Sequence, residues 1–572
     1  MSSRKFFLLF LTLLPLASGC SPDTTPSAGA GFAELVLTGG AVYTVDPQRS
    51  WQQAIAIRDG KIIYVGEDAG TVPLTGPDTQ VVELKGRMVL PGLQDIHIHP
   101  ISGGIEASAC DLNGLTNATE YLARIKSYAE ANPDAPWILG GGWLMPVFGP
   151  GAMPRKELLD EIVPDRPVLL HSADGHSSWA NSKALELAGI TAETPDPVDG
   201  RIDRDRETGE LIGSLQEGAS SLLDHVIPPT SASQREDGLR YTIDMLNAYG
   251  FTAMQDASVS EQDLQAYQVL NSNGELSLHV EASQWWDREQ GLEQVPTLLE
   301  QRKQYTAGQV RANTVKIMQD GVMENYTAVM LEPYLIEGEV RGIPMLDPEF
   351  LKIAVTALDA EGFQVHFHAI GDGAIRQSLD AVEAAREANG PSDHRHHISH
   401  LELIDPQDIP RFGELQVIAD FQPLWAFADD YIKDLTIPFI GEERARWLYP
   451  LESVRKSGGM LAFGSDWSVS TANPYHEIEV AVTRMDPDNA EDSVFIPEER
   501  ISLEEAIVAF TINAAFTNHL EGKTGSIETG KLADLVVLDQ NLFEISPQAI
   551  SDTRAVLTLF EGKPVHGKFS DL

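Results

Sequence analysis

Residues 89–99 read VLPGLQDIHIH, an apolar run that ends in two histidines. The run predicts a buried strand over residues 89–98, and His97 and His99 lie at its carboxyl end. Side chains two positions apart on a strand point to the same face, so both imidazoles can reach one metal ion. A pair of surface histidines is the alternative, which the apolar strand disfavours. The stretch therefore predicts a strand that carries metal ligands.

Seven more short apolar runs follow, and most alternate with helical stretches, at residues 252–257, 278–283, 314–319, 364–369, 396–403, 417–422 and 461–466. This alternation predicts an α/β fold with a parallel sheet, and eight strands are the number that closes a (β/α)8 TIM barrel. The first two strands are more than a hundred residues apart, which predicts a large insertion after barrel strand 1. We expect this insertion, at about residues 111–245, to cap the barrel mouth, with the barrel and its cap spanning residues 91–521.

Both ends of the mature chain are rich in short strands. Residues 33–90 contain a hairpin pattern around Asp59-Gly60, and residues 522–572 contain two further apolar runs. Unpaired sheet edges are a liability, so we expect the two ends to pair with each other. The sequence thus predicts a small β-sandwich domain built from both chain ends.

The first residues have the pattern of an export signal. Two basic residues precede an apolar run that is too short to span a bilayer, and small residues precede Cys20. This resembles a bacterial lipoprotein signal, with residues 1–19 removed, Cys20 lipidated and residues 20–32 a flexible tether. An ordinary signal peptide with an incidental cysteine is the alternative. We expect an exported lipoprotein of the bacterial cell envelope, bound to a membrane only through this anchor.

Charge and cysteine content limit the partners. The formal net charge is −44, with the acidic residues spread along the chain, which disfavours nucleic acid and anionic membranes as partners. The expected partner is a small-molecule substrate. A homo-oligomer is compatible with the sequence. Cys20 and Cys110 are the two cysteines, so a lipidated Cys20 leaves no disulfide pair and no cysteine-rich zinc site. Any metal must be held by His, Asp, Glu or a modified Lys.

Lys316 lies inside the fourth apolar run, where a bare ammonium group is costly. A buried lysine that loses its charge can react with carbon dioxide, and the resulting carbamate can bridge two metals. The alternative is a structural lysine paired with Asp320 or Glu324. Spacing alone favours neither the metal-bridging role nor the structural role of Lys316.

The fifth, sixth and eighth strands also end in polar side chains. His368 is favoured over His366 because it lies at the strand end, and His400 is the better candidate on the next strand. Asp466 ends the eighth strand, where a carboxylate can bind metal and carry protons. Its alternative role is to cap the next turn. In chain order the candidates are His, His, Lys, His, His and Asp.

This ordered set resembles the metal ligands of the amidohydrolase superfamily. The short sequence motifs around them resemble those of its amidohydrolase-3 branch, which includes N-substituted formamide deformylase. The matching stretches are residues 90–99, 174–182, 315–321, 368–372, 395–400, 463–466, 525–527 and 530–535. The resemblance implies two divalent ions, with Zn2+ expected. By the resemblance, one ion is held by His97, His99 and Asp466 and the other by His368 and His400, and carboxylated Lys316 bridges them.

The resemblance also implies the reaction. A metal-activated hydroxide attacks a carbonyl carbon, and Asp466 carries the proton to the leaving nitrogen, so that a C–N bond other than a peptide bond is hydrolysed. Candidate substrate contacts are Trp143, His171 and His176 from the insertion, and Trp467 after the eighth strand. Glu217 could replace the lysine as the bridging carboxylate, although an exposed helix position is favoured for it.

Two other functions remain open. A mononuclear deaminase of the same superfamily would use a glutamate in a His-Ala-Gly-Glu segment, but residues 368–372 read HAIGD, with no glutamate. A non-catalytic surface binding or regulatory barrel would have lost ligands, whereas all six positions are filled. Both observations favour the metal-dependent amidohydrolase.

Overall fold

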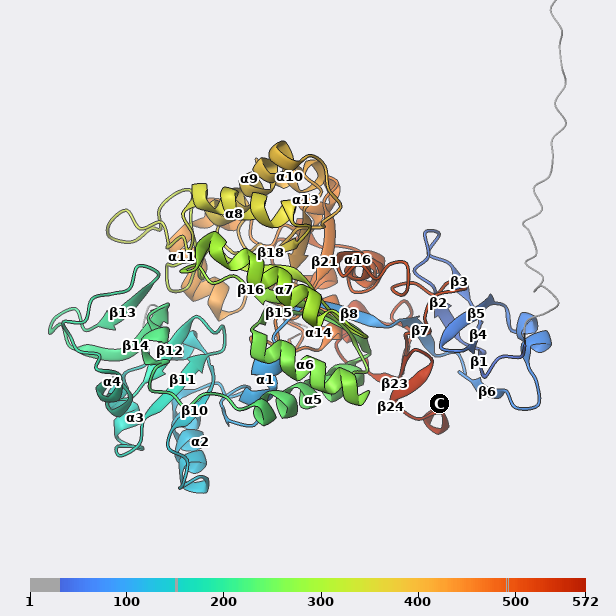
Figure 1. Ribbon diagram of the computed structural model, residues 1–572, viewed down its shortest axis with the longest axis horizontal. Helices are drawn as coiled ribbons and strands as arrows, with labels where there is room; N and C mark the ends of the chain where they lie inside the picture. The colour runs from blue at the N-terminus through green and yellow to red at the C-terminus, as the bar shows by residue number, and fades with distance from the viewer. Residues whose placement is uncertain (1–30, 150–152, 490, 492) are drawn as a thin grey trace, which may run out of the picture.

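The computed structural model describes residues 31–149, 153–489, 491 and 493–572. The signal peptide predicted for residues 1–19, Cys20 and most of the tether lie outside the described residues. Within the described part of the chain, no helix has the length and apolar character that a membrane span requires. Figure 1 shows a central barrel with the insertion at one end and the strand-rich chain ends at the other.

The predicted parallel barrel is confirmed. Its eight strands form one sheet in the order β21-β20-β19-β18-β17-β16-β15-β8. The strands are β8 (Leu93–Ile98), β15 (Phe251–Val259), β16 (His279–Trp285), β17 (Val310–Met318), β18 (Gln364–Ala369), β19 (His397–His400), β20 (Ile418–Phe421) and β21 (Met460–Phe463). Each of the eight predicted runs overlaps one of them.

Helices cover the outer face of this sheet, so its strands are buried on both sides and read as continuous apolar runs. The principal ones are α5 (Ala232–Tyr249), α6 (Glu261–Asn273), α7 (Val295–Tyr305), α8 (Pro348–Ala360) and α9 (Asp372–Asn389). Local sequence sets their ends. Ser260 and Asp263 form a capping box at the start of α6, and Gly274 ends it in a left-handed conformation at φ 72°.

The barrel closes where its first and last strands meet. At the carboxyl ends of β8 and β21, the Asp466 amide donates to the His97 carbonyl at 2.7 Å, and the His99 amide donates to the Trp467 carbonyl at 2.8 Å. A Cβ atom at Gly464 would lie 2.5 Å from the His97 backbone nitrogen. Only glycine permits this approach, so three of the predicted ligands are fixed by the closure itself.

The β-sandwich from both chain ends is also present. A four-stranded sheet has the order β5-β4-β1-β6, and a six-stranded sheet has the order β24-β23-β22-β7-β2-β3. The strands are β1 (Leu35–Thr38), β2 (Ala41–Tyr43), β3 (Trp51–Gln52), β4 (Ala54–Arg58), β5 (Lys61–Gly66), β6 (Gln80–Glu83), β7 (Met88–Pro91), β22 (Leu535–Leu538), β23 (Ala555–Phe560) and β24 (Lys563–Gly567). In Figure 1 the blue and red ends of the chain lie together.

The single strand predicted over residues 89–98 is wrong in one respect, because it is two strands. β7 pairs with β22 in the sandwich, and β8 begins the barrel. The break falls at Pro91-Gly92, where a Cβ atom on Gly92 would lie 2.2 Å from the Thr252 hydroxyl oxygen. Glycine therefore lets the chain turn from one domain into the other.

The insertion after barrel strand 1 forms a mixed sheet in the order β13-β14-β12-β11-β10-β9. Its strands are β9 (Cys110–Asp111), β10 (Ile138–Trp143), β11 (Val168–Ser172), β12 (Ser177–Ala180), β13 (Gly200–Arg204) and β14 (Leu211–Glu217). Helices α2 (Ala118–Ala131), α3 (Lys156–Asp160) and α4 (Ser182–Ala188) accompany it. Trp143 and Trp179 lie in a core that is separate from that of the barrel.

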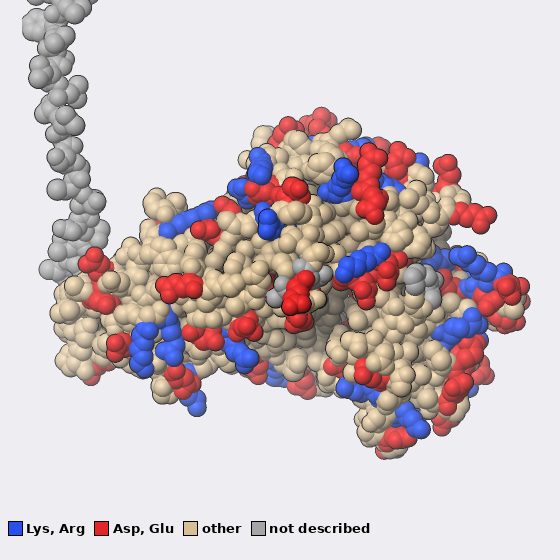
Figure 2. All heavy atoms as spheres, turned by 180° about the vertical axis from the view of Figure 1, so that it is seen from behind, with Lys and Arg blue, Asp and Glu red and all other residues tan. Residues whose placement is uncertain are grey.

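The surface carries both charges. Figure 2 shows Asp and Glu side chains distributed over one face of the molecule, with Lys and Arg side chains among them. This distribution agrees with the spread of acidic residues along the sequence.

We predict that Gly464→Ala lowers the free energy of unfolding by about 1–3 kcal/mol, because the added methyl group overpacks the closure against His97. Urea unfolding followed by circular dichroism measures the change. Gly522→Ala is the matched control, since a Cβ atom at Gly522 meets no atom within 4 Å. Equal midpoints for the two variants would show that the closure tolerates a side chain.

Candidate active site

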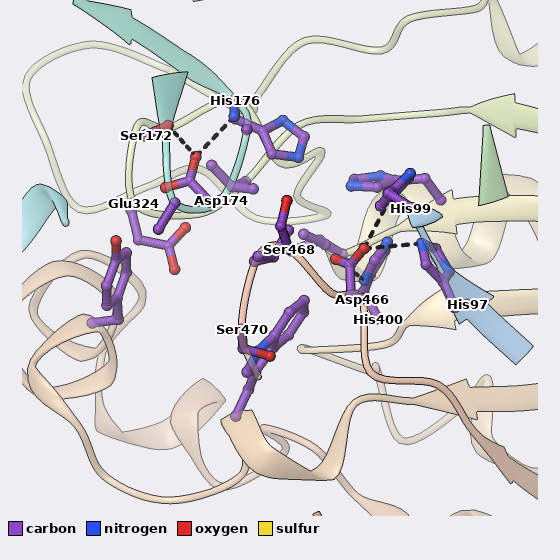
Figure 3. Close-up of a pocket in the computed structure, with 18 of the residues that line it drawn as sticks. His97, His99, Ser172, Asp174, His176, Glu324, His400, Asp466, Ser468 and Ser470 are labelled. Carbon is purple, nitrogen blue, oxygen red and sulfur yellow. Dashed lines mark hydrogen bonds and ion pairs between the residues drawn. The ribbon is translucent and has the colours of Figure 1, made fainter. Parts of the chain in front are cut away.

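A cavity of about 980 Å³ lies where the barrel mouth faces the insertion, and Figure 3 shows part of its lining. Its volume is in the range of small-molecule sites. All six predicted ligands line it, namely His97, His99, Lys316, His368, His400 and Asp466. Side chains that lie far apart in the sequence, such as His97 and Asp466, therefore meet in one cavity.

Asp466 is at the centre of the group. Its Oδ1 atom lies 3.3 Å from His97 Nε2 and 3.0 Å from His99 Nε2, and its Oδ2 atom lies 3.9 Å from His400 Nδ1. Burial acts to raise the pKa of Asp466, but the neighbouring His97 and His99 outweigh it and lower the pKa well below its usual range. Asp466 is thus an ionised carboxylate surrounded by imidazoles.

His368 faces His400, with ring centroids 4.4 Å apart. The Nδ1 atom of His368 lies 3.2 Å from Asp320 Oδ1, which directs Nε2 away from the carboxylate. That Nε2 atom and both ring nitrogens of His400 are buried without a hydrogen-bond partner. Buried polar atoms are almost always paired, so these three nitrogens indicate a site for a ligand.

Lys316 is buried and has no carboxylate within ion-pair distance in the described residues. The predicted alternative, a structural pair with Asp320 or Glu324, is therefore wrong. Its Nζ atom lies 3.3 Å from His366 Nε2 and 3.5 Å from His97 Nε2. Burial lowers the pKa of Lys316 to about 7, against the pull of Asp466 and Asp420. A pKa near 7 leaves a large share of the amine uncharged at neutral pH, and the uncharged amine is the form that can become a carbamate.

Two residues beneath the centre were missed or ranked too low by sequence. Asp420 on β20 lies 3.5 Å from His97 Nδ1 and accepts a hydrogen bond from Ser399. His366 Nε2 lies 2.9 Å from His97 Nδ1. His97, His366 and Asp420 form a second possible ligand trio, beside His97, His400 and Asp466. Asp420 orients His97 from behind, as Asp320 orients His368.

The site fits a divalent ion. Burial, reinforced by neighbouring positive groups, holds the pKa values of His366, His368 and His400 well below the usual range. These imidazoles are neutral, the form that binds metal. Together with the unpartnered nitrogens and the central carboxylate, they make a donor set of the type that binds zinc.

The backbone is strained at two of these residues. His400 has φ 80° and Asp466 has φ 52°, both in the left-handed region that non-glycine residues rarely adopt. Each such conformation costs on the order of 1–3 kcal/mol. The surrounding fold holds both side chains toward the cavity despite this cost.

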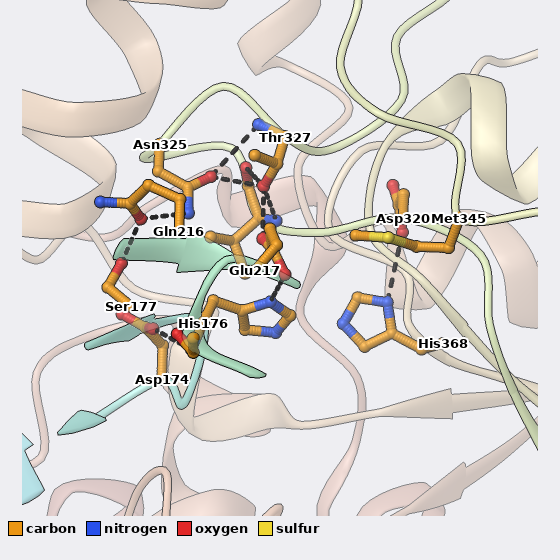
Figure 4. Close-up of polar contacts among 12 residues, drawn as sticks. Asp174, His176, Ser177, Gln216, Glu217, Asp320, Asn325, Thr327, Met345 and His368 are labelled. Atoms are coloured by element: carbon orange, nitrogen blue, oxygen red, sulfur yellow. Dashed lines mark hydrogen bonds and ion pairs between the residues drawn. The ribbon is translucent and has the colours of Figure 1, made fainter. Parts of the chain in front are cut away.

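His176 is joined to Glu217 at the edge of the insertion, as Figure 4 shows. His176 Nδ1 lies 2.9 Å from Glu217 Oε2, and the Thr327 hydroxyl donates to Glu217 Oε1 at 2.6 Å. Burial acts to lower the pKa of His176, but the Glu217 carboxylate raises it to about 9. The His176 ring lies 5.2 Å from that of His368.

The exposed helix position favoured for Glu217 is wrong. Glu217 ends strand β14 with φ 51°, and its side chain is 4% exposed. It lies in the cavity wall as the partner of His176, so the structure does not place it between metal ligands.

Of the three remaining candidate substrate contacts, one lines the cavity and two do not. His171 lines the cavity, and its Nδ1 atom lies 3.0 Å from the Ser178 hydroxyl. Trp143 does not line it, because its indole lies in the core of the insertion and donates to the Leu170 carbonyl. Trp467 does not line it either, and stacks on Tyr241 with ring centroids 6.4 Å apart.

A third group of His and Asp side chains lies outside the cavity. Asp359 Oδ1 lies 2.7 Å from His394 Nδ1 and 3.1 Å from His396 Nε2, and Oδ2 accepts from Asn389. The other ring nitrogen of His396 accepts from the Val365 amide. This group is held by hydrogen bonds within the protein, which explains it without a metal.

Comparison with known proteins gives consistent matches over most of the chain. The model of the amidohydrolase family matches residues 80–566. The chain is 34% identical to Protein LONG AFTER FAR-RED 3 of Arabidopsis thaliana, over 98% of this chain and 97% of the relative. It is 25% identical to N-substituted formamide deformylase of Arthrobacter pascens, over 92% and 97%. Among solved structures, an uncharacterized metal-dependent hydrolase of Pyrococcus furiosus has a TM-score of 0.69 and 26% identity, over 89% and 99%.

We predict that a chelator lowers the thermal unfolding midpoint and that zinc restores it, because an ion at a hundredfold its Kd stabilises the fold by about 3 kcal/mol. Asp466→Asn should lose most of this shift and reduce the metal content measured by plasma emission. Asp359→Asn is the matched control, since its hydrogen bonds already account for that group. If Asp359→Asn lost metal and Asp466→Asn kept its full metal content, the ion would be bound by the Asp359 group and not in the cavity.

Proposed function

We propose a function from one premise: the chain belongs to the amidohydrolase family, whose model matches residues 80–566. The family and its structural relative make the chain a metal-dependent hydrolase. Our proposal is that it hydrolyses a C–N bond of a small amide-like molecule, other than a peptide bond. The observation that carries it is the convergence of Asp466, Lys316 and four imidazoles in one buried cavity.

The proposed ligands divide into two sets around Lys316. His97, His99 and Asp466 would hold one ion, His368 and His400 would hold the other, and carboxylated Lys316 would bridge them. The unpartnered nitrogens of His368 and His400 and the lowered pKa of Lys316 support this assignment. Bound divalent ions supply a Lewis acid that polarises a carbonyl group and lowers the pKa of water.

Asp466 is the proposed proton carrier. Its Oδ1 atom is buried and lies between the imidazoles of His97 and His99, and the residue lines the cavity. An amide nitrogen leaves poorly until it is protonated. A carboxylate that takes the proton from the attacking water and gives it to this nitrogen supplies what C–N cleavage requires.

His176 is the proposed contact for the substrate carbonyl oxygen. Glu217 is placed to bind its Nδ1 atom, which leaves Nε2 to donate into the cavity. Glu217 is thus a positioning residue, itself held by Thr327. The similarity to N-substituted formamide deformylase supports an N-acyl or N-formyl amine as substrate.

The two alternatives have less support. Asp372 occupies the position of the deaminase glutamate, but it accepts a hydrogen bond from the Leu331 amide at 2.8 Å and does not line the cavity. A non-catalytic barrel gives no reason for buried imidazole nitrogens without partners beside Asp466, whose backbone is strained.

We predict that the purified protein hydrolyses N-formyl or N-acyl amines in a panel of amides, esters and imides, and that a chelator abolishes the activity. Asp466→Asn should lower kcat/KM by at least about a hundredfold, the usual contribution of a general acid–base group. Asp434→Asn, at an exposed position, should retain activity. Activity that survives both chelation and Asp466→Asn would refute the proposal.

We also propose that Cys20 anchors the protein to a membrane of the cell envelope, from the signal pattern in residues 1–20. In an export-competent bacterial host, the wild-type chain should sediment with membranes and incorporate labelled fatty acid. Cys20→Ser should incorporate none and appear in the soluble fraction. Membrane association unchanged in Cys20→Ser would contradict the anchor.

A further inference from the structure

The cavity has a second polar region, which we call the acidic wall. It consists of Asp174, Glu324, Glu402 and Asp429, all of which line the cavity. They come from four separate loops: before β12, after β17, after β19 and before η6 (Tyr431–Thr436). In Figure 3, Asp174 and Glu324 lie together, apart from Asp466 and the labelled histidines His97, His99 and His400.

Glu402 is the strongest sign that this wall binds something. The residue is 5% exposed, it lines the cavity, and its Oε2 atom has no hydrogen-bond partner. The Oδ2 atom of Asp174 is also buried without a partner. Unpaired buried carboxylate oxygens are costly and rare, so they indicate a missing donor.

The wall brings several buried acidic groups together, and their ionised forms are disfavoured. Burial raises the pKa of Glu324 to about 8, and the nearby Asp174 and Asp429 add to the rise. Two cationic groups that line the cavity already have carboxylate partners, since Arg288 lies 2.7 Å from Asp199 and His176 lies 2.9 Å from Glu217. A positively charged ligand would favour the ionised form of these carboxyl groups and pair with it.

The arrangement suits an organic cation better than a metal ion. None of the wall's residues belongs to the groups, among the described residues, whose ligand atoms converge within 4.8 Å. Phe427, Tyr431 and Tyr449 line the cavity as well. Spread carboxylates with aromatic rings nearby are a setting that binds ammonium and guanidinium groups, by ion pairing and cation–π contact.

We propose that the acidic wall binds a positively charged nitrogen group of the substrate, so that the preferred substrates are amide-like molecules that carry an ammonium or guanidinium group. The proposal rests on the proposed function for the bond that is cleaved. The two ends of the cavity then recognise different parts of one molecule, with the carbonyl group at Asp466 and the cation at Glu402 and Glu324.

Binding tests the wall without any turnover. Titration calorimetry of the metal-loaded full chain compares hexylammonium with hexan-1-ol, which differ in the charged head group. We expect hexylammonium to bind at least about tenfold more tightly, as for a hydrogen-bonded buried charge. Equal affinities for the two compounds would overturn the proposal, whatever reaction the protein catalyses.

Kinetics then tests the substrate class. N-formylcadaverine and N-hexylformamide share the scissile group and chain length and differ in a terminal ammonium or methyl. We expect kcat/KM to be at least about tenfold higher for the cationic substrate. Glu402→Gln and Glu324→Gln should each lower this ratio, whereas Glu332→Gln, 76% exposed, should not.

The outcomes of the two experiments are separable. A ratio of one in the wild-type protein, or an unchanged ratio in both wall variants, overturns the proposed preference. Failure to hydrolyse either formamide refutes the proposed reaction on formamides, and the calorimetry still decides whether the wall binds a cation. Hydrolysis of both with equal efficiency keeps the proposed reaction and removes the wall from it.

Discussion

The site depends on the closure of the barrel. The amides of Asp466 and His99 donate to the carbonyls of His97 and Trp467 across the junction of β8 and β21. Ser465, the residue before Asp466, donates from its amide to Asp95 of β8, which lies 370 positions earlier in the chain. Gly464 allows the backbones to approach this closely. Because the same backbone segments carry His97, His99 and Asp466, closing the sheet also fixes the distances among these side chains. The hydrogen bonds that close the barrel therefore also set the geometry of the candidate metal site.

Holding the site in this form costs free energy. His400 and Asp466 have left-handed backbones, and the nitrogens of His368 and His400 are buried without partners. Asp320 and Asp420 hold two of the imidazoles from behind, so the ring orientations do not depend on the ion. A rigidly held set of buried donor atoms is what a preorganised metal site requires.

The sequence was sufficient for the barrel because each strand is buried on both faces and leaves an apolar run. It was sufficient for His97 and His99 because they end such a run. It could not reveal Asp420, which stands alone in its strand, or the role of Glu217, whose contact with His176 arises only in the folded insertion. The sequence also suggested a substrate contact that the structure does not have. Trp143 lies near polar motifs in the sequence, but its side chain is buried in the core of the insertion.

The acidic wall was beyond sequence reasoning for the same reason. Its residues come from four loops, and no spacing relates them. Side chains two positions apart on one strand leave a pattern in the sequence. Loops come together only through the packing of the elements that they join, so their residues leave no such pattern. The insertion supplies one member, Asp174, and the barrel loops supply the rest. The cavity is therefore a joint product of the barrel and the insertion.

The central claim is that the six side chains at the barrel mouth bind metal together. Anomalous diffraction from crystals of the zinc-loaded protein, recorded on either side of the zinc absorption edge, tests it most directly. The account predicts two peaks inside the cavity, one beside His97, His99 and Asp466 and one beside His368 and His400, with density for a carbamate on Lys316 between them. Anomalous peaks confined to other sites, with these six side chains unliganded, would contradict it.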